Sequence, residues 1–125
     1  MLRLALLLAS AVLAGCALSA IPPTAPVIGG LQCGPQVYPF YALQNWQWGQ
    51  VVVRAQVGAD GRLANGVVEQ PAASSYLNAA AVDAMRQCRT VAAAPGTTVR
   101  AVVLYDLLNG DEHLPRGIVN VVPAP

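Results

Sequence analysis

The sequence has no lysine, a single histidine and few charged residues of either sign. Arginine supplies every basic group, the seven arginines nearly balance six acidic residues, and charged residues make up only 10% of the chain. A protein that binds nucleic acid or an anionic membrane surface through charge normally carries a clustered excess of basic residues. The composition therefore predicts no nucleic-acid partner and no electrostatic contact with a membrane.

The sequence also lacks the patterns of common catalytic and cofactor sites, including a glycine-rich phosphate-binding loop. His113 follows Asp111 and Glu112 directly, and three consecutive residues cannot easily all face one metal ion, so a solvated loop is the better interpretation. Nothing places a serine and an acid beside His113 as a catalytic triad. Asp60 and Glu69 stand at the two ends of an expected hairpin and do not form a paired-carboxylate site. We predict no enzyme activity, no cofactor and no metal.

The longest apolar run covers residues 4–13, which is about half of the roughly 20 residues needed to span a bilayer as a helix. Arg3 precedes the run, and two small residues follow it directly before Cys16. This layout is typical of a secretory signal peptide with its cleavage site. The sequence Leu13-Ala14-Gly15-Cys16 resembles the bacterial lipobox, whose cysteine is diacylated and becomes the first residue of the mature protein.

Two alternatives to a lipoprotein remain open, namely an ordinary signal peptide with a chance cysteine and a short uncleaved anchor. We take residues 1–15 as a lipoprotein signal peptide and Cys16 as the lipid carrier, which places the protein on the periplasmic side of the cell envelope. The acyl chains would attach it to a membrane without a transmembrane helix. Ala17 stands where an aspartate would favour the inner membrane, so the outer membrane is the expected location.

Removal of the first 15 residues leaves 110, enough for one small domain on a tether. Residues 16–30 are rich in proline and glycine, which resist helix and sheet, and we interpret them as the tether to a domain over residues 31–125. Cys33 and Cys88 remain as an even pair in an oxidising compartment and are predicted to form a disulfide that closes a loop of about 55 residues. The alternative is two buried free thiols.

The pattern of apolar residues predicts an α+β fold. A short helix is expected within residues 38–48, and strict alternation over residues 49–57 predicts a half-buried strand. Asp60-Gly61 is a hairpin signal, and the second strand returns over residues 63–70 with an irregularity at Asn65-Gly66.

Helical spacing follows over residues 76–89, capped by Ser74-Ser75, with an apolar stripe that turns Cys88 inward. Residues 97–108 are rich in β-formers, and residues 118–122 are suited to a last short strand. The expected architecture is a small antiparallel sheet of about three strands with one main helix packed on one face.

These residues together resemble the C-terminal domain of TonB-family proteins. Each short motif is weak alone, but their order and spacing are fairly specific, and they cover almost the whole globular part of the chain. The resemblance rests on Tyr38-Pro39, residues 49–54, Val57, Asp60-Gly61, Ser74-Ser75, residues 77–81, Ala84 and residues 99–105.

The chain departs from the family pattern in ways that bear on function. Asn78 replaces the usual aspartate, and residues 88–91 replace an aromatic residue followed by proline. The membrane-spanning helix and the long proline-rich arm of true TonB proteins are not recognisable. The resemblance therefore implies the recognition end of an energy transducer without its motor, acting as an adapter or accessory in envelope transport. The alternative class is a structural lipoprotein that braces a secretion complex or contacts peptidoglycan.

Two groups of residues are candidates for binding. In the TonB family the last strand of the sheet accepts an extended segment of an outer-membrane receptor, which implies strand addition along residues 99–105, to an envelope protein or to a second copy of the chain. Residues 118–122 could instead fold back and cover that edge. Trp46 and Trp48 face the same way in an extended chain. They could form an aromatic platform for a glycan or peptide, but core packing and edge covering is the better interpretation. The candidate edge consists of Val99, Arg100, Ala101, Val102, Val103, Leu104 and Tyr105.

Overall fold

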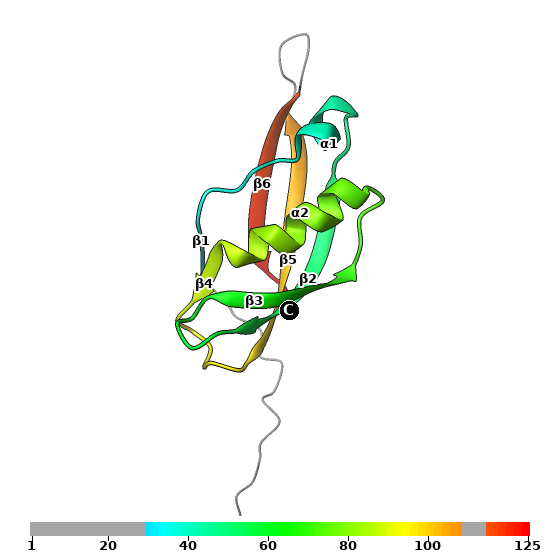
Figure 1. Ribbon diagram of the computed structural model, residues 1–125. Helices are drawn as coiled ribbons and strands as arrows, with labels where there is room; N and C mark the ends of the chain where they lie inside the picture. Colours follow the sequence, from blue (N-terminus) through cyan, green and yellow to red (C-terminus); the bar gives the residue numbers. More distant parts are fainter. Residues whose placement is uncertain (1–29, 109–114) are drawn as a thin grey trace, which may run out of the picture.

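Four antiparallel strands in the order β3-β2-β5-β6 form the main sheet, and a two-stranded ribbon of β1 and β4 lies beside it. The protein is represented by a computed structural model that describes residues 30–108 and 115–125 (Figure 1). The predicted α+β class is confirmed, although the main sheet has four strands where about three were expected. The elements are β1 (Leu31–Cys33), α1 (Phe40–Gln44), β2 (Gly49–Val57), β3 (Leu63–Gln70), α2 (Ser75–Arg86), β4 (Cys88–Thr90), β5 (Thr98–Leu108) and β6 (Arg116–Pro123).

The hairpin of β2 and β3 follows the alternation that the sequence predicts. Every second residue of β2 from Val51 to Val57 is buried. Figure 1 shows that α2 covers one face of the sheet that contains β2. The irregularity predicted at Asn65-Gly66 is confirmed, because the register between the two strands shifts there and Asn65 adopts a left-handed φ of 55°. This bulge bends β3 over the helix, and α2 packs on β3 and β2.

The main helix begins as predicted and ends earlier than predicted. The hydroxyl of Ser74 accepts a hydrogen bond from the backbone N–H of Leu77, which caps the first turn. The expectation of a helix to residue 89 is wrong, because the N–H of Gln87 bonds to the carbonyl of Ala84 and the chain then becomes extended. Residues 88–90 are β4, which pairs with β1.

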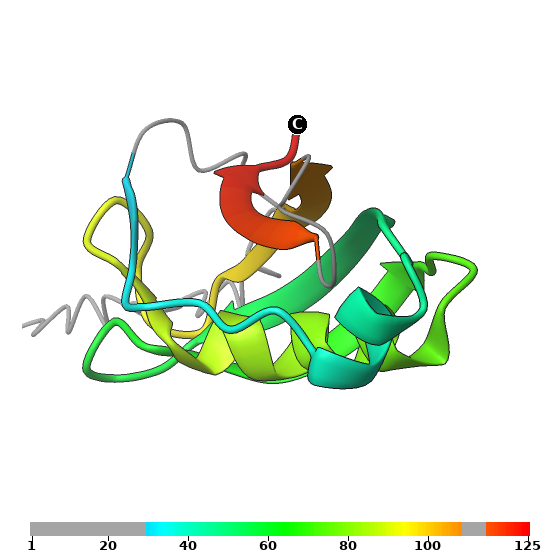
Figure 2. The same cartoon turned by 90° about the horizontal axis from the view of Figure 1, so that it is seen from above.

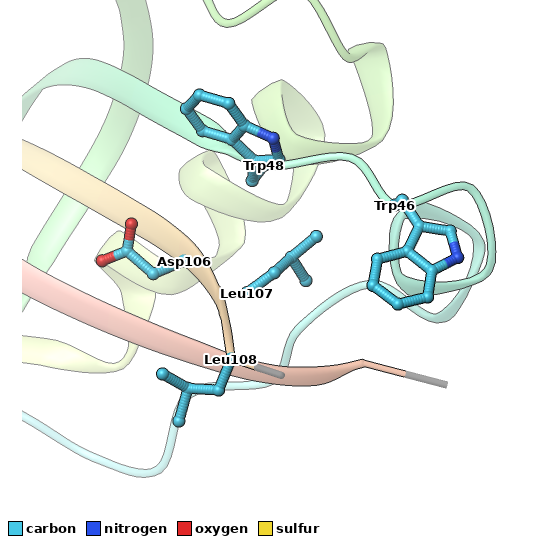
Figure 3. Close-up of a pocket in the computed structure, with 5 residues that line it drawn as sticks. All are labelled: Trp46, Trp48, Asp106, Leu107 and Leu108. Carbon is cyan, nitrogen blue, oxygen red and sulfur yellow. The ribbon is translucent and has the colours of Figure 1, made fainter. Parts of the chain in front are cut away.

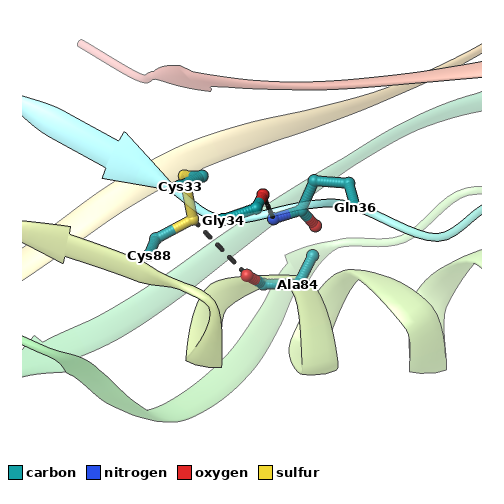
Figure 4. The surroundings of a disulfide bond; sticks show 5 residues. All are labelled: Cys33, Gly34, Gln36, Ala84 and Cys88. Carbon is teal, nitrogen blue, oxygen red and sulfur yellow. Dashed lines mark hydrogen bonds between the residues drawn. A yellow bond between two sulfur atoms is a disulfide. The ribbon is translucent and has the colours of Figure 1, made fainter.

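The predicted disulfide is present and joins the two strands of the ribbon, just after the end of α2. Cys33 and Cys88 stand opposite each other in the β1–β4 pair, with an S–S distance of 2.04 Å (Figure 4). The N–H of Gly34 donates to the carbonyl of Gln87 at 2.8 Å and continues the ladder beyond the disulfide. The N-terminal entry of the domain is therefore closed by one covalent bond and a short ladder.

Strand β5 lies inside the sheet, so the prediction that residues 99–105 form a free edge is wrong. Residues 98–105 pair with β2, and residues 101–108 pair with β6. The alternative that residues 118–122 fold back over this edge is confirmed. Viewed from above in Figure 2, β6 ends the sheet on the side away from β3.

Within residues 30–108 and 115–125, no helix is long and apolar enough to cross a membrane. The expected signal peptide, Cys16, nearly all of the tether and the Asp111–His113 run lie outside the described residues.

Candidate functional site

The outer edge of β6 carries backbone groups that point away from the sheet. The N–H of Ala124 donates to the carbonyl of Arg100 at 3.0 Å, which identifies this pair as hydrogen-bonded. Because such pairs alternate along an antiparallel ladder, the even-numbered residues of β6 bond to β5. The N–H and C=O groups of Gly117, Val119 and Val121 are therefore directed outward.

Among the described residues this edge is unpaired and nearly uncharged, although β1 comes close to part of β6. Among the residues that the structure describes, none forms a hydrogen bond with the outward groups of β6. The side chains of Ile118 and Val122 are more than one-third exposed on the sheet face opposite α2, and Arg116 is the only charged residue of the strand. Natural sheet edges are commonly blunted by charges, bulges or covering segments, and an edge without them accepts another strand readily.

Gly117 fixes β6 against the body of the domain. A Cβ atom at this position would lie 2.3 Å from Cδ2 of Tyr38, so only glycine allows the ring to cover the strand. The Tyr38 ring meets the Tyr105 ring edge-to-face at 5.3 Å, and its hydroxyl donates to the carbonyl of Gln47. Burial, and to a smaller degree the negative charge of Asp106, raises the pKa of Tyr38.

The residues predicted to form the binding edge support β6 instead. Val99, Ala101, Val103 and Tyr105 are buried on the face that carries α2. The other three lie on the opposite face, where Nε of Arg100 donates to Glu69 at 2.8 Å and Nη1 of the same side chain donates to the carbonyl of the C-terminal residue at 2.8 Å. Their backbone groups are occupied by β2 and β6, so this segment offers no unpaired ladder.

The two tryptophans stand between α1 and β2 and line a cleft beside the last residues of β5. Trp46 is 57% exposed and Trp48 is 69% exposed, so the interpretation of this pair as core residues is wrong, while edge covering stays a prediction. Together with Asp106, Leu107 and Leu108 they border a cleft of about 340 Å³ (Figure 3). Figure 3 shows the two indole rings on either side of Leu107, with the Asp106 carboxylate near Trp48. We call this the aromatic cleft.

The backbone that carries the tryptophans is held in place by specific hydrogen bonds. Trp46 has a φ of 52°, in the left-handed region that bulky residues rarely adopt. Its N–H donates to the carbonyl of Leu43, and the next N–H, of Gln47, donates to Ala42 at 2.8 Å. The side-chain oxygen of Gln47 also accepts a hydrogen bond of 2.6 Å from the hydroxyl of Ser74. The fold therefore stabilises an uncommon conformation that keeps Trp46 at the surface.

Three more exposed aromatic residues lie near the cleft. Phe40 and Tyr41 project from α1, and Tyr76 projects from the first turn of α2. The rings of Tyr41 and Tyr76 stack at 5.5 Å. Five of the seven aromatic residues of the chain are thus exposed around α1, a region that we call the aromatic end. The sequence did not predict this cluster of aromatic residues. Residues 40 and 41 lie in α1 and residue 76 lies in α2, and only the folded structure brings the two helices together.

No group of three potential metal ligands occurs within the described part of the chain. The described acidic residues are instead spread over separate elements, and two of them form ion pairs with arginine, Asp83 with Arg86 and Glu69 with Arg100. The two candidate sites are the strand edge of β6 and the aromatic cleft.

Comparison with known proteins agrees with the fold. No curated protein and no solved structure gives a significant match. Residues 34–105 match the family described as the Gram-negative bacterial TonB protein C-terminal domain, a span that runs from the end of β1 through most of β5 and leaves β6 outside. Since this match covers more than half of the sequence, the chain belongs to the TonB C-terminal domain family.

Proposed function

We propose that this chain is the protein-binding module of an outer-membrane lipoprotein, which acts as an adapter in envelope transport by accepting an extended segment of a partner along the outer edge of β6. The family consists of domains that bind other envelope proteins, which supports a protein partner in general. The partner's segment would become a fifth strand of the main sheet.

The unpaired outer edge of β6 is the observation that carries this proposal. Gly117, Val119 and Val121 each offer one N–H and one C=O, so a partner strand gains up to six main-chain hydrogen bonds. In strand addition the main-chain bonds supply affinity, and the alternating side chains supply selectivity. Ile118 and Val122 on one face would contact the side chains of the added strand.

Addition outside β6 is favoured over displacement of β6. The strand pairs with β5 over eight residues, and Gly117 is packed under the Tyr38 ring. A partner would have to break this whole ladder before it could replace the strand. The family match ends at Tyr105, so β6 is an addition to the matched region that moves the free edge one strand outward.

The N-terminal sequence supports attachment to a membrane. A lipid-carrying Cys16 would lie 15 residues before the first residue of β1, so the tether reaches at most about 50 Å. The domain would therefore act close to the membrane that holds it. The intact mass of the protein extracted from membranes should correspond to a chain that begins at Cys16 and carries acyl groups. A chain of another start, or one without added mass, contradicts the lipoprotein assignment.

A pair of proline variants one residue apart tests the strand edge. Val119→Pro removes an outward N–H and should abolish binding to the partner while leaving the β5–β6 ladder intact. Asn120→Pro removes an N–H that bonds to β5 and should lower the stability of the domain. Binding is measured by photo-crosslinking from residue 118 in native envelopes.

Crosslinks to a receptor or secretion component that disappear in Val119→Pro support the proposal. Crosslinks that persist in that variant contradict strand addition at this edge. Crosslinks confined to other parts of the same chain favour the structural class, in which the lipoprotein braces an envelope complex or contacts peptidoglycan.

A further inference from the structure

We propose that the aromatic cleft binds a proline-rich segment of a partner protein in the polyproline II conformation. This is a second binding mode, separate from strand addition, and it uses side chains where the β6 edge uses backbone. The cleft is bordered by Trp46, Trp48, Asp106, Leu107 and Leu108 (Figure 3).

The hydrogen-bonding groups of the cleft match a ligand that needs donors. An indole N–H donates and does not accept, and neither tryptophan makes a side-chain hydrogen bond within the described residues. A polyproline II segment has no internal hydrogen bonds, and its proline residues have no N–H, so it presents mainly free carbonyl groups. Figure 3 shows the ring nitrogen of Trp46 on the side away from Leu107, so the donor to one of these carbonyls is assigned to Trp48, and Trp46 contributes the face and edge of its ring.

The walls of the cleft suit flat, rigid rings. Indole and leucine side chains form most of the lining, and recognition of proline-rich segments in known domains uses grooves lined by aromatic residues. The left-handed Trp46 backbone and its hydrogen bonds hold the platform before any ligand arrives. A preformed site combined with a ligand that is already extended minimises the entropy lost on binding.

Asp106 gives the cleft a preference for ligands that carry a positive charge. Its carboxylate lies near Trp48 in Figure 3 and forms no ion pair within the described part of the chain. An arginine or lysine beside the prolines of the ligand would complement this charge. A neutral saccharide fits less well, because each hydroxyl group needs acceptors as well as donors, and Asp106 is the only acceptor side chain among the lining residues.

The ligand is assigned to a partner and not to this chain's own Pro22-Pro23-Thr24-Ala25-Pro26 segment. That segment lies five to nine residues before β1, so it reaches at most about 18 Å from Leu31 at Pro26 and about 32 Å at Pro22, and only with the linker fully extended. In Figure 2, β1 (blue-cyan) and α1 (teal) lie on opposite sides of the domain, and the cleft adjoins α1.

The chain offers a direct optical test, because Trp46 and Trp48 are its only tryptophans. The full chain in detergent is titrated with a synthetic peptide in which two of every three residues are proline and one end carries an arginine. We expect a saturable change in tryptophan emission. A peptide of the same composition in scrambled order, with prolines separated and the extended run lost, should bind at least tenfold more weakly.

Variants are compared through the anisotropy of a labelled peptide. Trp48→Ala should weaken binding at least tenfold, and Trp48→Phe should give an intermediate loss because it retains a ring and removes the N–H. Asp106→Asn should remove the preference for the arginine-bearing peptide over an alanine-bearing one. Tyr41→Ala, an exposed aromatic residue outside the cleft lining, serves as the matched control and should bind normally.

Three results would overturn the proposal: no saturable change at millimolar peptide, equal binding by Trp48→Ala and the unchanged chain, or saturable binding of a neutral oligosaccharide in place of the peptide. None of these depends on the β6 edge, so the Val119→Pro experiment can fail or succeed independently.

Discussion

The domain has two ends that are held in different ways. At the disulfide end, Cys33 and Cys88 join β1 to β4, the strand that directly follows α2, by a covalent bond. At the aromatic end, the segment between α1 and β2 is held by hydrogen bonds from Ser74 and Tyr38 to Gln47. The covalent end fixes where the chain enters the domain, and the hydrogen-bonded end displays side chains.

The difference follows from what each end must do. A chain of 125 residues can bury only a modest core, and a disulfide limits the freedom of the unfolded state where the entering segment adds few contacts of its own. The aromatic end instead exposes five large rings, which contribute little to the core. Its order has to come from specific polar contacts below the surface. We therefore expect variants at the disulfide end to change stability alone, and variants at the aromatic end to change the environment of the exposed tryptophans as well.

The largest effect is expected at the disulfide end. Cys88→Ala should lower the free energy of unfolding by about 2–5 kcal/mol, as the loss of a native disulfide does in small secreted domains. Chemical denaturation measures the change. The emission maximum of the folded variant should stay the same, since both tryptophans lie at the aromatic end. An altered emission would show that the two ends are coupled.

A smaller loss of stability, together with a shift in tryptophan emission, is expected at the aromatic end. Ser74→Ala removes the cap of α2 and the hydroxyl that bonds to Gln47, and should cost about 0.5–2 kcal/mol. In contrast to Cys88→Ala, it should shift the tryptophan emission. Ser74→Asp restores the cap but cannot donate to Gln47, so it should recover stability without restoring the emission. Identical spectra for all three proteins would contradict the proposed role of this hydrogen bond.

Tyr105 beneath the aromatic end predicts sensitivity to high pH. Its hydroxyl has no hydrogen-bond partner in the described structure, and burial, followed by the proximity of Tyr38 and Asp83, raises its pKa above the ordinary value of 10. The native state therefore keeps a proton that the unfolded state releases, so this contribution to stability is complete below about pH 10 and falls as the pH rises above it.

Tyr105→Phe should reduce this alkaline loss and change stability at pH 7 by no more than about 1 kcal/mol, since no hydrogen bond is broken. Thermal unfolding between pH 7 and 11 measures both effects. A marked loss of stability at neutral pH would reveal a partner for the hydroxyl group.

The smallest effect is expected between the two ends, on the open face of the sheet. Glu69→Gln breaks the ion pair with Arg100, whose side chains are both about one-third exposed, and should cost at most about 1 kcal/mol. The loss should shrink in high salt because screening already weakens the pair. A cost that does not depend on salt would indicate that Glu69 acts through hydrogen bonding alone.

The local elements were predictable because each depends on neighbours in the sequence. The alternation of β2, the turn at Asp60-Gly61 and the cap at Ser74 reflect short-range chemistry. The departure at Asn78 is now explained as well. Its side chain donates to the carbonyl of Ala72 and accepts from the N–H of the same residue, and an aspartate could only do the latter.

The role of the last strands was not predictable in the same way. Residues 99–105 are mostly apolar, with three valines. Such residues occur in edge strands and in interior strands, so composition does not decide between the two positions. What decides between them is Gly117, which lets Tyr38 cover β6, and that contact joins residues 79 positions apart in the sequence. The exposure of Trp46 likewise depends on a left-handed backbone conformation that no local sequence motif predicts.

Residue-resolved amide hydrogen exchange of β6 tests the central claim most directly. Antiparallel pairing with β5 and a free outer edge predict an alternating pattern, in which Ile118, Asn120 and Val122 exchange slowly and Gly117, Val119 and Val121 exchange fast. Addition of the partner should then slow the second set and leave the first unchanged. Slow exchange of all six amides in the isolated chain would show that the edge is already covered and would contradict the account.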